Sequence, residues 1–179
     1  MACTFNAATA IRTETLEKIA DGNAKMTPWS QLQHNYPPGL KISPAAMVLH
    51  KSQSYWMILD LSFVHNHSDR HTPSVNESTS TSMAPLATMQ NLGWILPCLI
   101  ATLANAPPGS PFLFAKLGIM DGFWWLVVSE SDAYNFTFVL PTLSNDPPND
   151  PMTVIPSSIP MGWTLSPPTS AQHWKLHVT

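Results

Sequence analysis

The sequence predicts an α+β fold in which helices pack against an antiparallel sheet. Apolar residues recur at helical spacing in some segments and alternate in others, in the order helix, hairpin, helix, strand, turn, hairpin and helix. The Gly-rich phosphate loops GxGxxG and GxxxxGK followed by Ser or Thr do not occur, which argues against a doubly wound parallel sheet. Hydrophobic residues make up 44% of the 179 residues, enough for the core of one domain.

The first part of the chain predicts a helix, a linker and a hairpin. The helix begins with Thr13 as N-cap and ends at Gly22. Residues 26–44 are rich in Pro and are expected to form an irregular linker. Residues 45–50 and 55–62 have strand-like patterns, and only a short segment separates them, which favours a β-hairpin.

The middle of the chain predicts a loop followed by a long helix. Residues 65–82 are polar and lack periodicity, as in a loop, and Pro85 suits the first position of a helix. Apolar residues then recur at three- and four-residue steps, which predicts a buried stripe with a kink at Pro97. The stripe consists of Met89, Leu92, Leu96, Leu99 and Leu103.

The last third predicts short elements separated by turns. They are a strand over 112–117, a tight turn at Asp121-Gly122, a helical turn over 129–134, strands over 135–140 and 154–161, and a final helix with Ser166 as N-cap.

Charge and cysteine content exclude several classes of protein. Charged residues are only 11% of the chain, against about 25% in a typical soluble domain. Eight basic and eleven acidic residues give a net charge of −3, so the basic surplus of many nucleic-acid-binding proteins is missing. Cys3 and Cys98 form neither a disulfide framework nor a metal knuckle and favour a reducing compartment.

The sequence also argues against export and membrane insertion. The N-terminal residues lack a basic start followed by an apolar run, so no secretory signal is expected. The longest apolar stretch, residues 92–104, contains Pro97 and is shorter than the about 20 residues that span a bilayer. We therefore expect an intracellular protein without a membrane partner.

Three segments, taken in order, resemble the reverse transcriptase domain of retroelements. The first runs from Lys41-Ile-Ser-Pro through His50-Lys51-Ser52 to Tyr55-Trp-Met-Ile-Leu-Asp60-Leu-Ser62 and is similar to the fingers hairpin. The second, Phe114-Ala-Lys-Leu-Gly118-Ile-Met-Asp121-Gly-Phe123-Trp124, is similar to the first palm motif. The third, Ile159-Pro-Met-Gly162-Trp163-Thr-Leu-Ser166-Pro167, is similar to the Pro-Gln-Gly-Trp-x-x-Ser-Pro motif. The resemblance covers about residues 40–175.

The resemblance implies the fingers and the front part of the palm of a right-hand polymerase over residues 44–179, preceded by an extension and linker over residues 1–43. In intact members of the family, carboxylates hold two Mg²⁺ ions for nucleotidyl transfer to a primer. The residues carried over as nucleotide-binding remnants are Lys51, Asp121, Phe123, Gly162, Trp163 and Ser166.

The chain departs from the family pattern at the positions of the metal-binding carboxylates and of two arginines. Gly118 stands at the position of the first metal-binding Asp, and no Asp-Asp pair occurs, so the Tyr-x-Asp-Asp motif is missing. Trp56 and Trp125 stand at positions of family arginines, and a single C·G to T·A change converts an Arg codon to a Trp codon. These departures predict an inactive, truncated copy that takes no Mg²⁺ cofactor and binds nucleic acid weakly or not at all. An unpaired sheet edge is expected to favour self-association.

Two other interpretations remain open. The chain could be a non-catalytic module, derived from a polymerase, that binds nucleic acid or protein. Alternatively, it could be a segment of a longer, active polymerase.

Several candidate residues also have structural explanations. Lys51 suits a solvated hairpin lysine, Asp60 a strand-end hydrogen-bond acceptor, and Asp121 a tight turn. Phe123, the steric gate for a 2′-OH in the family, suits a core aromatic position. The surface histidines His65, His67 and His71 lack the complementary ligands of a zinc site.

Overall fold

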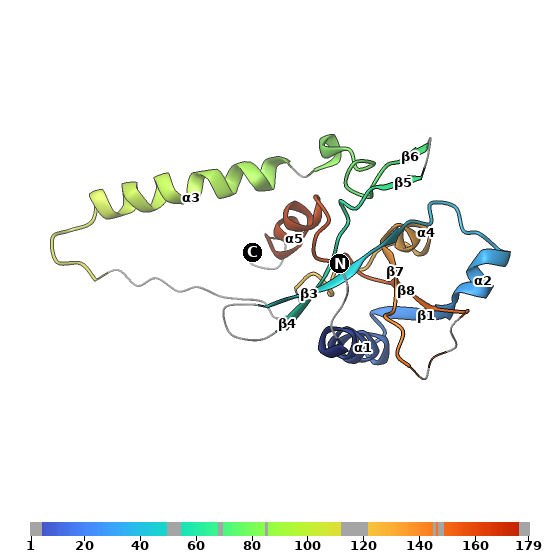
Figure 1. Cartoon of the computed structure of the whole chain (residues 1–179). Coiled ribbons are helices and arrows are strands. Elements are labelled where there is room, and N and C mark those ends of the chain that lie inside the picture. Colours follow the sequence, from blue (N-terminus) through green and yellow to red (C-terminus); the bar gives the residue numbers. More distant parts are fainter. Residues whose placement is uncertain are drawn as a thin grey trace.

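The computed structural model shows a mixed α+β fold with several helices and a partly antiparallel sheet (Figure 1). The described residues are 5–49, 55–67, 70–84, 86–111, 122–144, 146 and 149–175.

The central sheet has four strands in the order β1-β8-β7-β2. These strands are β1 (Ala24–Pro28), β2 (Ile42–Ser43), β7 (Thr137–Val139) and β8 (Met152–Pro156). β8 pairs antiparallel with both β1 and β7, whereas the short β2 pairs parallel with β7. The α+β class is confirmed, but the sheet is not antiparallel throughout.

Side chains of successive residues in β8 point to opposite faces of this sheet. Val154, which is fully buried, points into the larger core together with Phe138 of β7 and Ile11 of the first helix. Ile155 belongs to a smaller cluster with Leu32 and Ala133. These two residues come from α2 (Trp29–His34) and α4 (Glu130–Ala133), so short helices cover the second face.

The first helix, α1 (Phe5–Ala20), is longer than the sequence predicts, and Thr13 lies in its interior. The predicted end is confirmed, because Gly22 adopts a φ of +78°. The N–H groups of Gly22 and Asn23 donate to the carbonyls of Ile19 and Lys18, the hydrogen-bond pattern of a Schellman cap. α1 packs against β1 and against the hairpin of β3 (Ala45–Leu49) and β4 (Tyr55–Leu59).

Residues 26–44 are more regular than predicted. They contribute most of β1 and the whole of α2 and β2. The linker prediction is wrong because β1 is stabilised by pairing with the remote β8, which a local pattern cannot reveal. The domain boundary at residue 43 stays a prediction.

The predicted hairpin is confirmed in its described residues. β3 (Ala45–Leu49) pairs antiparallel with β4 (Tyr55–Leu59). The predicted loop over 65–82 is partly wrong, because β5 (His65–His67) and β6 (Arg70–Thr72) form a second small hairpin. A short 3₁₀ helix, η1 (Thr81–Met83), follows.

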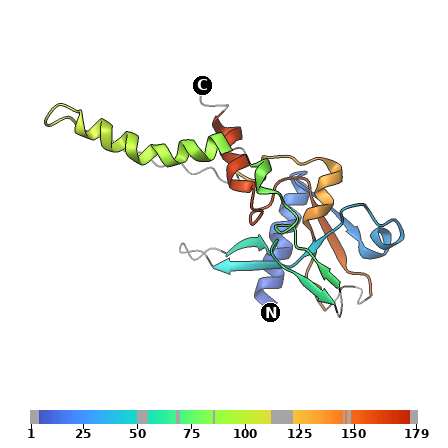
Figure 2. The ribbon, with the colours of Figure 1, turned by 90° about the horizontal axis from the view of Figure 1, so that it is seen from above.

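α3 (Leu86–Ala104) confirms the predicted long helix, but the described part of the predicted buried stripe is exposed. The side chains of Met89 and Leu92 lie outside the described part of the structure. Leu96, Leu99 and Leu103 are 65%, 37% and 43% exposed. The helix projects from the body of the molecule in both ribbon views (Figures 1 and 2). Among the described elements, α3 packs against α5 (Ser166–Lys175). No helix in the described ranges has the length and apolar character needed to cross a membrane.

The helical turn over 129–134 and the strand over 135–140 are confirmed, whereas the strand predicted over 154–161 is β8 and ends at Pro156. The final helix is confirmed but its predicted N-cap is wrong, because Ser166 is the first residue of α5 and its hydroxyl donates to the carbonyl of Pro160 instead of accepting a helix N–H.

α4 begins after Ser129, whose hydroxyl accepts the N–H of Asp132 as an N-cap, and the 3₁₀ helix η2 (Tyr134–Phe136) leads into β7. The predicted strand over 112–117 and Asp121 lie outside the described residues.

Candidate functional site

The third motif forms a well-anchored loop between β8 and α5, here called the 159–166 loop. The N–H of Ile159 donates to the carbonyl of Leu126 at 2.8 Å. The buried hydroxyl of Ser166 donates to the carbonyl of Pro160, also at 2.8 Å. The two ends of the loop are therefore held by hydrogen bonds on its buried side.

Gly162 brings the 159–166 loop against the β3–β4 hairpin. Its φ is +107°, a conformation that residues with a Cβ rarely adopt. A Cβ built on Gly162 would lie 2.6 Å from the carbonyl oxygen of Leu59, at the end of β4. The first and third motifs are thus in direct contact, and only glycine fits between them.

Asn76 reinforces this contact, and the sequence analysis did not identify it as a site residue. Its Nδ2 donates to Ser62 Oγ at 2.9 Å and to the carbonyl of Gly162 at 3.0 Å. Its Oδ1 accepts the N–H of Thr164 at 2.9 Å. One side chain therefore joins the segment after β4 to the 159–166 loop.

A local signal in the sequence could have located the turn that carries Asn76. Ser74 and Glu77 form a reciprocal capping box, in which each side chain accepts the other residue's backbone N–H. The Ser-x-x-Glu spacing predicts such a turn. It does not predict that Asn76 faces the third motif, because that contact depends on the tertiary fold.

Trp163 packs inward rather than toward a ligand. Its Nε1 donates to Thr79 Oγ1 at 2.9 Å, and its ring meets Phe136 edge to face at 5.5 Å between centroids. Both the polar and the apolar part of the indole are therefore engaged by the protein.

Only the last residues of the second motif, from Gly122 onward, belong to the described part of the chain. Phe123 is half-buried, and its carbonyl accepts the N–H of Leu126, the residue that anchors Ile159. Asp121, Lys51 and the glycine at position 118 lie outside the described residues.

The structure also describes three further residues that the sequence motifs single out, Asp60, Trp56 and Trp125. The carboxylate of Asp60 accepts the N–H of Ser62 at 3.2 Å, which confirms its role as a strand-end acceptor. Trp56 and Trp125 are 45% and 66% exposed, so both tryptophans lie at the surface.

The donor set does not fit the two Mg²⁺ ions that the resemblance implies. Position 118 is glycine, which offers no side-chain oxygen. Among the described residues, no group of three or more His, Cys, Asp or Glu side chains comes together. We therefore assign no step of chemistry to a metal ion in this chain.

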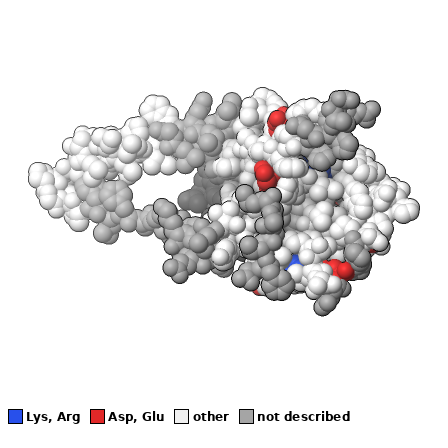
Figure 3. Space-filling model, in the orientation of Figure 1, with Lys and Arg blue, Asp and Glu red and all other residues white. Residues whose placement is uncertain are grey.

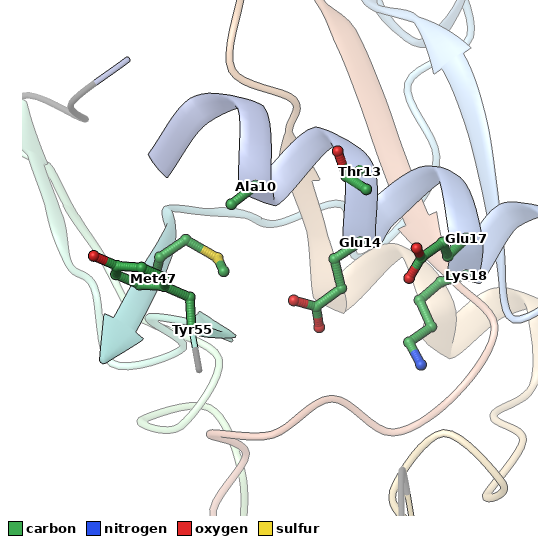
Figure 4. Close-up of a pocket in the computed structure, with 7 residues that line it drawn as sticks. All are labelled: Ala10, Thr13, Glu14, Glu17, Lys18, Met47 and Tyr55. Atoms are coloured by element: carbon green, nitrogen blue, oxygen red, sulfur yellow. The ribbon is translucent and has the colours of Figure 1, made fainter. Parts of the chain in front are cut away.

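A hollow of about 450 Å³ lies between α1 and the β3–β4 hairpin (Figure 4). Glu14 and Lys18 point from α1 toward it, and Met47 and Tyr55 line the opposite side. Glu14 accepts the N–H of Met57, and the Lys18 Nζ lies 5.3 Å from the Trp124 ring centroid. Glu14 and Lys18 are therefore engaged in contacts that hold α1 against the rest of the fold.

A second hollow of similar volume lies beside Lys41. The ammonium of Lys41 donates to the carbonyls of Pro73 and Ser74 at 2.7 and 3.1 Å. Burial lowers the pKa of Lys41, and the nearby negative charge of Glu77 opposes this shift. Lys41 therefore stabilises the turn that carries Asn76 by hydrogen bonds to its backbone.

Basic residues are sparse, and the Lys and Arg side chains that the structure describes contact other groups of the fold. The view in Figure 3 shows only isolated Lys, Arg, Asp and Glu on this face. Arg12 forms an ion pair with Asp146 at 2.6 Å, and Lys25 lies 3.2 Å from Glu130. No continuous basic surface forms on the part of this face that the structure describes.

No protein-family model matches the chain, and no curated protein matches it either.

Proposed function

We propose that the chain is a reverse transcriptase-like polypeptide of retroelement origin that retains part of a fingers and palm scaffold and has no polymerase activity. The observation that carries the proposal is the contact between the first and third motifs at Gly162 and Leu59. The resemblance implies that both motifs act on one incoming nucleotide, so they must be neighbours. Their direct contact supports the resemblance.

The surface tryptophans support the proposed loss of function. Trp56 and Trp125 stand where the family carries arginine, and both indoles are substantially exposed. Arginine suits an exposed position that faces phosphate, whereas an indole ring carries no positive charge with which to pair a phosphate. A single C·G to T·A change at each codon accounts for both residues.

The absence of activity follows from the residues that remain. Nucleotidyl transfer needs carboxylates to hold the ions that stabilise the attacking and leaving oxygens. Gly118 supplies none, and the 179 residues contain no Asp-Asp pair. The 159–166 loop and the hairpin then act only as packed parts of the scaffold.

The coding DNA tests this proposal. We expect TGG codons at Trp56 and Trp125 where intact copies in the same genome read CGG. We also expect amino-acid-changing substitutions to be as frequent as silent ones across the reading frame. Purifying selection over the frame, or intact copies that lack arginine at both positions, would contradict the proposal.

Extending the reading frame distinguishes a degenerate copy from a segment of a longer polymerase. A downstream Tyr-x-Asp-Asp motif would supply two of the missing carboxylates. Gly118 would still leave the first palm position without a ligand, so we expect the longer polypeptide to be inactive unless this residue is changed to Asp.

A further inference from the structure

No further inference is drawn: the strongest candidate, the largely apolar hollow of about 450 Å³ between β2 and the turn after β6, carries none, because the ammonium of Lys41 in its wall donates to Pro73, Ser74 and Ser78 within the fold and nothing in the structure shows what covers its apolar side chains.

Discussion

Gly162 occupies a position in which the fold has no room for a side chain. Its positive φ and the nearby Leu59 carbonyl act together, because any Cβ would be both strained and in collision with backbone. Backbone atoms cannot move aside as the end of a flexible side chain can. The contact between the 159–166 loop and the hairpin therefore requires glycine here.

Gly162→Ala is expected to lower the free energy of unfolding by about 3 kcal/mol, from backbone strain and steric overlap together. Gly22→Ala is the matched control, because Gly22 also has a positive φ but nothing within 4 Å of its built Cβ. It should cost about 1 kcal/mol. Equal losses in denaturant unfolding of the two variants would contradict the close contact at Leu59.

Asn76→Ala is expected to cost about 2 kcal/mol, because it leaves several polar groups at the loop contact without their partner. The amide of Thr164 should also lose protection in hydrogen exchange, since Asn76 Oδ1 accepts its N–H. Asn76→Asp keeps an acceptor oxygen and should retain that protection.

Asn135→Ala serves as the control for this measurement. Asn135 Nδ2 makes an exposed hydrogen bond to the carbonyl of Asp132, so its loss should cost about 0.5 kcal/mol. Full protection of the Thr164 amide in Asn76→Ala would show that Asn76 does not hold the loop.

At the scale of elements, α1 belongs to the core. Ile11 is completely buried and joins the cluster formed by the sheet and the hairpin. Arg12 ties the helix to the segment after β7, through the carbonyl of Pro141 and the carboxylate of Asp146. Residues before position 44 therefore contribute to stability.

Ile11→Ala should destabilise the chain by about 2–4 kcal/mol, because it leaves a cavity in the core between α1 and the sheet. Leu16→Ala removes a side chain of the same size from a position that is 49% exposed. It should change stability by only about 0.5 kcal/mol. Similar small effects of both substitutions in thermal unfolding would instead indicate that residues 1–43 are a detachable extension.

The elements that the sequence predicts are those with strong local signals. The β3–β4 hairpin has two apolar runs close together, and Ser129 before Glu130 and Asp132 marks the start of α4. β1 was missed because its pairing with β8 is a long-range contact, and Pro28 argues locally against a strand. The leucine spacing on α3 predicts a helix and an apolar seam, but spacing alone cannot say whether the seam is covered within the chain.

In the candidate site, too, local motifs predict some residues, whereas contacts between remote segments determine the rest. The motif letters identify Gly162 and Trp163, yet the Asn76 contacts depend on how three separate segments meet. Inward packing of Trp163 against Phe136 likewise follows from the tertiary fold and not from the motif.

For the whole molecule, charge predicts weak binding to nucleic acid. The net charge is −3, and Arg12 and Lys41 are committed to contacts within the fold. In filter binding, the logarithm of the affinity for single-stranded RNA should fall with the logarithm of salt at a slope shallower than about −2. A slope steeper than about −4 would indicate several phosphate contacts and would favour a nucleic-acid-binding module.

The most direct test of the central claim is primer elongation by the purified 179-residue chain with Mg²⁺ on RNA and DNA templates. We expect no elongation above that of a mock preparation. The same is expected for Gly118→Asp, because one restored carboxylate does not replace the missing Asp-Asp pair. Template-dependent elongation by the unaltered chain would contradict the account.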